Sequence, residues 1–318
     1  MISEKRAFLI SIDTEGDNIW ARPEKIFTQN ASYLERFQGL CDRHGFKPTY
    51  LTNYEMALDH DFLNFGREVL KSKSAEIGMH LHAWDTPPLK SLSPKDWYNQ
   101  PYATEFPSEL IHRKASYLTR LLEDRFQTVI TSHRAGRWGF SASYARTLVE
   151  LGYEVDCSVT PGVSWSNHIG HPGGSGGVDF RNFPAKAYRL DLQDIARPGG
   201  STLVELPMTI VVGKRPLYRQ LARRLMGRKG PRLDWLSPKG DNLDLMLKIV
   251  AQAAAKKWPY IQFTLHSSEF MPGGSPTFAD EASIEALYCD LESLFANISK
   301  SFVGMTLTEY KRKIYQDL

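Results

Sequence analysis

Residues 7–15, which read AFLISIDTE, decide the fold of this chain. Residues 7–12 form a short apolar run rich in branched side chains, which is typical of a strand buried on both faces. The run leads into Asp13 and Glu15. On an extended backbone these two carboxylates point to one side, about 7 Å apart. Two like charges at the end of a strand favour a metal site, and the alternatives are a pair of solvated turn acids or a helix N-cap.

Helical and strand-like patterns alternate along the rest of the chain. The spacing of apolar residues predicts helices near residues 31–45, 62–71, 108–125, 141–151, 243–257 and 281–298. Strand-like runs lie between them at residues 47–51, 76–80, 128–132, 154–158, 203–212, 260–266 and 302–305. This alternation predicts parallel βα units, arranged either as a closed barrel or as an open doubly wound sheet. A chain of 318 residues with 42% hydrophobic side chains fits one α/β domain with a single large core.

The composition excludes several classes of protein. The 39 basic and 36 acidic side chains give a formal charge of only +3, so the chain has no overall field suited to nucleic acid. Cys41, Cys157 and Cys289 are far apart and lack CxxC spacing, which argues against a disulfide framework or a zinc knuckle. The sequence contains neither a secretion signal nor a run of about 18 apolar residues, so we expect a cytoplasmic protein without a transmembrane helix.

Two stretches interrupt the alternation, and we expect them to be insertions in a single domain that spans residues 1–318. The first, at about 161–183, is rich in glycine and should lie beside the active site, since long loops in compact domains are more often functional than idle. The second, at about 213–242, contains a strongly basic stretch at residues 214–232. This stretch fits an amphipathic helix that touches an anionic membrane surface, a contact with a phosphate-bearing substrate, or a solvated insertion on the rim of the barrel.

His80-Leu81-His82 follows another predicted strand and adds to the acid pair. Two histidines separated by one residue share a face of an extended chain. Imidazoles together with a carboxylate form a ligand set for zinc or another borderline divalent ion. The alternative is a pair of core or surface histidines. Combined with Asp13 and Glu15, the histidine pair predicts a metal site.

Three further strand ends carry polar side chains. One is followed by Arg134, Arg137 and Trp138. An arginine can hold a carboxylate through two hydrogen bonds and an indole can stack on a sugar face, although a surface salt bridge is the alternative for the arginines. Asp156 and His266 end later strands, and a histidine paired with an aspartate has the makings of a general acid. The alternative for this histidine is a core position with satisfied hydrogen bonds.

The order of these motifs resembles the five motifs of the polysaccharide deacetylases, the NodB-homology or carbohydrate esterase family 4 enzymes. Within that family the chain most resembles cytoplasmic bacterial proteins of O-antigen and surface-polysaccharide biosynthesis, through SIDTEG at 11–16, EIGMHLH at 76–82 and LHSSE at 265–269. The likeness spans roughly residues 7–310. It implies a distorted (β/α) barrel and a metal-dependent de-N-acetylase.

The resemblance also implies a role for each motif. Asp13 is the base, and Arg134 holds it in position. Glu15, His80 and His82 hold a divalent metal, with zinc preferred over cobalt, nickel and manganese. Two of these ligands depart from the family pattern. The family's second acid is usually adjacent to the first, and its second histidine usually lies two residues further on, where this chain has a tryptophan.

The remaining roles concern the leaving group and the substrate. Asp156 is expected to tune His266, the general acid that protonates the departing nitrogen. Trp84, Arg137 and Trp138 are expected to contact the substrate, an N-acetylated sugar linked to a nucleotide or to a lipid.

The predicted function is removal of an N-acetyl group from a sugar in bacterial O-antigen or capsule biosynthesis. A lipid-linked substrate would fit contact of residues 214–232 with the inner membrane surface, and a diphosphate-bearing substrate would fit the same charges. Two alternatives stay open. One is a catalytically inactive, deacetylase-like barrel that binds sugar, its altered acid and histidine spacing having lost the metal. The other is another metal-dependent amidohydrolase, in which a His-x-His pair belongs on the first strand and is joined by further histidines or a carboxylated lysine.

Overall fold

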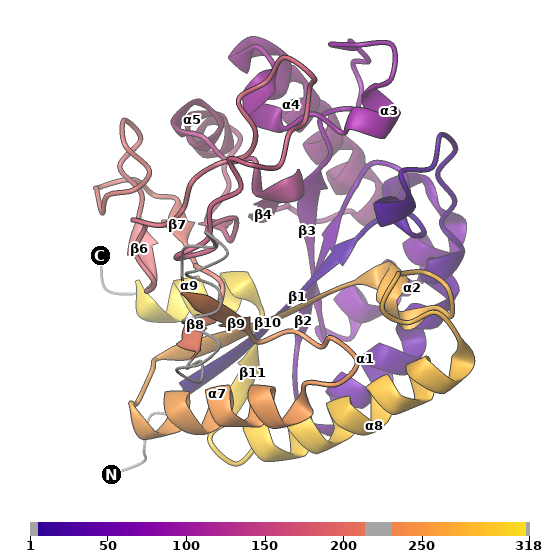
Figure 1. Ribbon diagram of the computed structural model, residues 1–318, viewed down its shortest axis with the longest axis vertical. Coiled ribbons are helices and arrows are strands. Elements are labelled where there is room, and N and C mark those ends of the chain that lie inside the picture. Colours follow the sequence, from indigo (N-terminus) through magenta and orange to yellow (C-terminus); the bar gives the residue numbers. More distant parts are fainter. Residues whose placement is uncertain (1–5, 214–230, 316–318) are drawn as a thin grey trace, which may run out of the picture.

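The fold is a curled, mostly parallel β-sheet with helices around its outside (Figure 1). The structure, a computed structural model, describes residues 6–213 and 231–315. Across the main sheet the strands are β10 (Tyr260–His266), β1 (Arg6–Thr14), β2 (Pro48–Thr52), β3 (Glu76–Leu81), β4 (Ser132–Ala135), β5 (Val155–Asp156), β7 (Val204–Glu205) and β6 (Tyr188–Arg189), with β11 (Phe302–Met305) also beside β1. The helices are α1 (Leu34–Arg43), α2 (His60–Lys71), α3 (Asp96–Asn99), α4 (Ser108–Phe126), α5 (Ala142–Glu150), α7 (Leu243–Ala255), α8 (Glu281–Ile298) and α9 (Leu307–Ile314).

β1 has parallel neighbours along both edges, which agrees with its uninterrupted apolar run. β10 pairs with nearly the whole length of β1 on one edge, and β11 and β2 divide the other edge between them. From β2 the sheet continues in parallel through β3, β4, β5 and β7, and β6 then runs antiparallel to β7. The predicted parallel βα units are therefore confirmed.

The two ends of this sheet are joined by the chain that follows β7. The amide of Leu206 donates to the carbonyl of Asp156 (2.8 Å), and the hydroxyl of Thr209 accepts from the amide of Gln262 on β10 (2.8 Å). The hydroxyl of Tyr260 donates to the carbonyl of Pro207 at 2.9 Å. These contacts bring β10 close to the far end of the sheet. The sheet thus curls into a distorted barrel, and the predicted fold class is confirmed.

The side chains of β1 alternate between the two faces of the sheet, and this alternation places the polar site. The outward row packs in the large core under the helices and consists of Phe8, Ile10 and Ile12. The inward row changes from apolar to polar along the strand and consists of Ala7, Leu9, Ser11 and Asp13. The apolar half of this inward row belongs to a smaller inner cluster, which residues of β5, β7 and α9 complete.

The inward row of β10 has the same gradient. Tyr260 belongs to the inner cluster, and Gln262, Thr264 and His266 follow at alternate positions. In the pairing of the two strands, Asp13 lies opposite His266. The polar ends of both rows therefore meet at the carboxyl end of the barrel, while apolar side chains fill the other end.

The two predicted insertions differ in how much of them is described. Residues 161–183 form an irregular loop with one isolated β-bridge between Ser164 and Asp179. Around the second insertion, β8 (Ile210–Gly213) and β9 (Arg232–Trp235) pair as an antiparallel ribbon. Residues 214–230, which hold most of the predicted basic helix, lie outside the described residues. No helix in the described part of the chain is long and apolar enough to cross a membrane.

Candidate metal centre and active site

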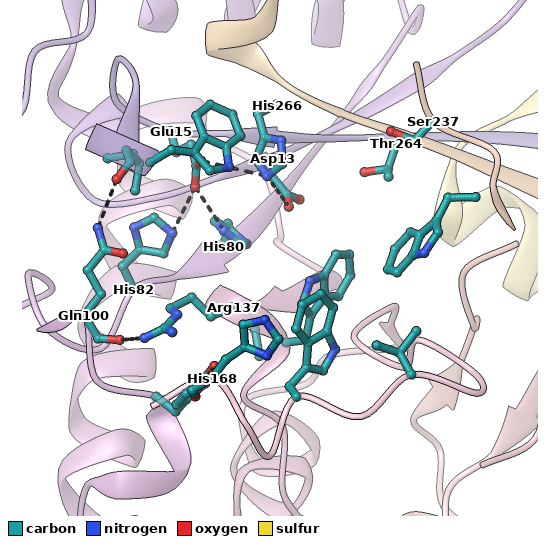
Figure 2. A pocket seen from close by; sticks show the side chains of 18 of the residues that line it. Asp13, Glu15, His80, His82, Gln100, Arg137, His168, Ser237, Thr264 and His266 are labelled. Carbon is teal, nitrogen blue, oxygen red and sulfur yellow. Dashed lines mark hydrogen bonds and ion pairs between the residues drawn. The ribbon is translucent and has the colours of Figure 1, made fainter. Parts of the chain in front are cut away.

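The predicted motifs converge on a cavity of about 610 Å³ at the carboxyl ends of β1, β3, β4 and β10 (Figure 2). The predicted site residues that line it are Asp13, Glu15, His80, His82, Trp84, Arg137, Trp138 and His266. Arg134 lies directly behind Asp13, to which it is hydrogen-bonded. Asp156 lies elsewhere, on the outer face of the sheet. Residues from distant parts of the sequence thus form one site, as the strand order requires.

Glu15, His80 and His82 form a compact group of metal-binding side chains. Glu15 Oε2 lies 3.4 Å from Nε2 of His80 and 3.0 Å from Nε2 of His82, and one donor atom from each residue lies within 4.8 Å of the others. The other ring nitrogen of His80 donates to the carbonyl of Arg134 (3.1 Å), which leaves Nε2 free to bind an ion. Two imidazoles and one carboxylate are the protein ligands of many catalytic zinc sites, so these residues fit a divalent metal.

The charges of this group favour the short contact between Glu15 and His82. Burial alone would raise the pKa of Glu15, but hydrogen bonds to both histidines hold it well below its usual range. Burial likewise opposes the charged form of His82, yet contacts with Asp85 and Glu15 raise its pKa well above the ordinary value. Glu15 and His82 therefore form a buried ion pair, in which a divalent cation would take the place of the histidine's proton.

Asp13 is held in a fixed position by Arg134. Nη1 of Arg134 donates to Oδ1 of Asp13 at 2.5 Å, and Nη2 donates to the hydroxyl of Ser11 at 2.6 Å. Burial would raise the pKa of Asp13, but the guanidinium, together with His80 and His266, lowers it overall. The second carboxylate oxygen, Oδ2, lies 3.7 Å from Nε2 of His266. Asp13 is thus ionised at neutral pH, with one oxygen bound and the other directed toward the site, as a base requires.

His266 takes its carboxylate partner from its own chain segment. Oε2 of Glu269 lies 3.0 Å from Nδ1 of His266 and also accepts from the backbone amide of His266 at 2.8 Å. Burial lowers the pKa of this histidine, but Glu269, Glu15 and Asp13 together raise it to about 9. The side chain is 30% exposed, and Nε2 faces the acids of the site. His266 is therefore protonated at neutral pH and accessible from the cavity.

The predicted pairing of Asp156 with His266 is wrong. Oδ1 of Asp156 lies 2.6 Å from Nδ1 of His133, and both side chains are fully buried. Nε2 of the same histidine lies 2.8 Å from the hydroxyl of Tyr144 on α5. The reason is strand alternation: His133 and Asp156 are register partners whose side chains face the helices, whereas His266 faces the barrel interior. Asp156 thus stabilises the outer packing of the barrel.

The predicted substrate-contacting residues all line the cavity, and they differ in the contacts that their side chains already make. Trp84 stacks on the ring of His82, with centroids 4.3 Å apart. Arg137 donates to the carbonyls of Asn99 and Gln100, so its guanidinium is already engaged in holding the neighbouring loop (Figure 2). The indole of Trp138 lies in the cavity wall, with the Arg134 guanidinium 4.9 Å from its ring centre.

Sequence reasoning missed several residues of the cavity wall. Trp235 lies 5.9 Å from Trp138 and 6.4 Å from Trp165, and Trp20 packs edge-on against His266 at 4.7 Å. Trp165 belongs to the glycine-rich loop, so part of this loop lies beside the cavity. These residues come from a loop, a single 3-10 turn and a short ribbon outside the main sheet, none of which has a periodic pattern long enough to be recognised in the sequence. Glu269 did have one, because it lies within the LHSSE stretch, three residues after the histidine.

Comparison with known proteins gives a fold but no close relative. No model of a known family matches the chain, and no curated protein sequence matches it. Among solved structures, a protein from Mycobacterium smegmatis described as a polysaccharide deacetylase superposes with a TM-score of 0.54 at 13% identity, over 99% of this chain and 93% of that one. This chain has the distorted barrel of a polysaccharide deacetylase.

A second structural neighbour shows that this fold does not determine the reaction. A 4-alpha-glucanotransferase from Thermococcus litoralis superposes with a TM-score of 0.53 at 14% identity, over 97% of this chain and 40% of the longer neighbour. The same architecture therefore occurs in proteins with different reactions, and function has to be argued from the side chains of the site.

Proposed function

We propose that the protein is a metal-dependent hydrolase that removes an N-acetyl group from a sugar. The observation that carries this proposal is the juxtaposition of three donors, Glu15, His80 and His82, with an acid and a base. The base is the ionised Asp13 and the acid is the protonated His266, and Oδ2 of Asp13 lies 3.7 Å from Nε2 of His266. Hydrolysis of an acetamide needs an electrophile, a base and an acid, and these groups supply a place for each.

Asp13 and His266 each carry out one proton transfer in the proposed reaction. When bound, a divalent ion polarises the acetyl carbonyl and lowers the pKa of water. Asp13 accepts a proton from the water whose oxygen adds to the acetyl carbon, while Arg134 keeps the carboxylate oriented. His266 then donates its proton to the sugar nitrogen as the C–N bond breaks, and the products are acetate and a free amine. Glu269 keeps His266 charged until that step.

The wider setting of this reaction is also a proposal. The motif resemblance supports a role in bacterial O-antigen or capsule biosynthesis, in the cytoplasm, with zinc as the metal and a nucleotide-linked or lipid-linked sugar as substrate. The tryptophans in the cavity wall support a sugar ligand, since indoles stack on sugar faces. The amidohydrolase alternative fits less well, because the histidine pair lies at the end of β3, whereas the acids lie at the end of β1.

Elemental analysis combined with acetate release tests the proposal. We expect about one divalent ion per chain in the wild type and loss of both metal and acetate release in His80→Ala and His82→Ala. His168→Ala is a matched control, because His168 lines the same cavity outside the metal-binding group and its loss should leave the metal bound. N-acetylated nucleotide sugars and lipid-linked saccharides serve as separate substrates. Absence of metal and of acetate release under metal supplementation would favour the inactive sugar-binding protein.

A further inference from the structure

His82 has a second set of neighbours on the side away from Glu15. Its Nε2 faces the proposed metal position, and its Nδ1 faces a group formed with Glu55 and Asp85, whose donor atoms lie within 4.8 Å of one another. Trp84 covers one face of the ring. Nothing in the proposed reaction uses Glu55 or Asp85, so their presence at this histidine needs its own explanation.

A comparison with His80 shows what that side of His82 lacks. In His80 the nitrogen that points away from the metal position donates to a backbone carbonyl, that of Arg134, at 3.1 Å. In His82 the corresponding atom lies 3.8 Å from Oδ2 of Asp85 and 3.5 Å from the amide nitrogen of Asn53. The amide nitrogen is itself a donor, and the amide oxygen of Asn53 already accepts from the backbone of Met56. Asn53 thus cannot accept the proton of Nδ1 in this orientation.

The two carboxyl groups next to His82 are unusual in having no hydrogen-bond partner within the described residues. All four oxygens of Glu55 and Asp85 are shielded from solvent, and within the described residues none has a hydrogen-bond partner. A buried carboxylate oxygen without a donor is costly, so such groups normally have a specific partner. Nδ1 of His82 lies 3.8 Å from Oδ2 of Asp85 and can supply such a donor.

We propose that Asp85, supported by Glu55, is the positioning residue for the metal ligand His82. Metal binding through Nε2 requires that the ring carry its proton on Nδ1, and a carboxylate at that atom fixes the tautomer, orients the ring and strengthens the ligand. The acceptor for Nδ1 of His80 is the backbone carbonyl of Arg134, and the proposed acceptor for Nδ1 of His82 is the carboxylate of Asp85. The 3.8 Å between Nδ1 of His82 and Oδ2 of Asp85 is longer than a hydrogen bond, so a small movement of one side chain towards the other is required when an ion binds.

This inference rests on the metal site of the proposed function, and Co²⁺ binding separates the two. The probe is Co²⁺ alone, titrated into the metal-free full-length protein, with the visible absorption band of the bound ion as a readout of ligand geometry. The variants are Asp85→Ala, Asp85→Asn and Glu55→Gln. Asp61→Asn on the exposed side of α2 is the control for loss of a carboxylate elsewhere.

We expect Asp85→Ala to weaken Co²⁺ binding by about 10- to 100-fold and to change the absorption band, which a purely structural role would leave unchanged. Asp85→Asn, which keeps an acceptor but loses the charge, should fall between Asp85→Ala and the wild type. Glu55→Gln should weaken binding less than Asp85→Ala, and it carries the test if Asp85→Ala does not fold. The control should bind as the wild type does.

Three results would overturn the inference. Wild-type affinity and spectrum in both Asp85→Ala and Glu55→Gln would show that the carboxylates do not act through His82. Two Co²⁺ ions per wild-type chain, of which only the second is lost in Asp85→Ala, would make Glu55 and Asp85 ligands of their own cation instead. No Co²⁺ bound to the wild type would remove the metal site itself and the proposed function with it.

Discussion

Replacing Arg134 by methionine is the most direct perturbation of the buried charges in this protein. The Arg134 side chain is 0% exposed and that of Asp13 is 5% exposed, so neither can turn to water when its partner is removed. Removing one member of a buried ion pair typically costs about 3–5 kcal/mol, because the other charge is left without compensation. The same substitution removes the hydrogen bonds to Ser11 and to the carbonyl of Cys157. We therefore expect Arg134→Met to lower the free energy of unfolding by at least about 3 kcal/mol near pH 7.

The pH dependence of this loss identifies its cause. In the wild type the pKa of Asp13 is lowered, so the pair contributes stability above the unfolded pKa of about 4 and loses it as the pH falls further. In Arg134→Met the guanidinium no longer offsets burial, so we expect the pKa of Asp13 to rise. The buried, ionised carboxylate of Asp13 then lowers the stability of the folded protein at neutral pH, and protonation of this carboxylate removes that cost. The difference between the two proteins should therefore be largest near pH 7 and shrink towards about pH 4.

Urea unfolding followed by tryptophan fluorescence at several pH values measures this difference, provided that the slope with urea is the same in both proteins. Asp13→Asn combined with Arg134→Met removes both charges and should recover part of the loss, with a coupling of about 1–3 kcal/mol in the double-mutant cycle. A loss below about 1 kcal/mol, or one of the same size at every pH, would refute the reasoning from buried charge.

Three further predictions concern the site. Glu269→Gln should lower the pKa of His266 from about 9 towards its ordinary value of about 6.5 in the metal-free protein, measured by NMR titration, and an unchanged pKa would exclude Glu269 as the cause. Gly136→Ala would place a Cβ 2.6 Å from the ring of His82 and should reduce activity about 100-fold, whereas Gly39→Ala, which meets nothing within 4 Å, should have no effect on kcat/KM. Chelation should destabilise the wild type by about 2.7 kcal/mol relative to protein at 100 times the metal dissociation constant, and His80→Ala should unfold at one temperature with or without chelator.

The sequence carried most of the information needed for the fold. β1 and β10 could be predicted because both are apolar runs that end in a polar residue. β3 could be predicted because the histidine pair lies at its end. Other strands were harder to place. The predicted strand at 203–212 proved to be two short strands, β7 and β8, in different sheets. Their extent depends on which neighbour offers hydrogen bonds, and that is a property of the assembled barrel.

The convergence of the site could be predicted for the same reason. Parallel strands of one sheet end on the same side, so polar residues that end separate strands must approach one another. Asp13 and His266 are such residues, and the register of β1 and β10 places them opposite each other. The tryptophans at 165 and 235 could not be predicted this way, because they come from an irregular loop and from a ribbon outside the main sheet.

The role of Asp156 shows where motif order fails and strand alternation would have succeeded. Val155 and Cys157 belong to the inner cluster of the barrel, so the residue between them has to face the helices. His133 meets it there, on the opposite face from the neighbouring Arg134, which points inward to Asp13. His133 and Arg134 are adjacent in the sequence and belong to one sequence motif. Because they are adjacent in a strand, their side chains point to opposite faces of the sheet. His266 instead has its carboxylate partner, Glu269, in a 3-10 turn. The tight winding of this turn returns the third residue after a strand end to that end, so the difference between strand and turn decides which carboxylate reaches His266.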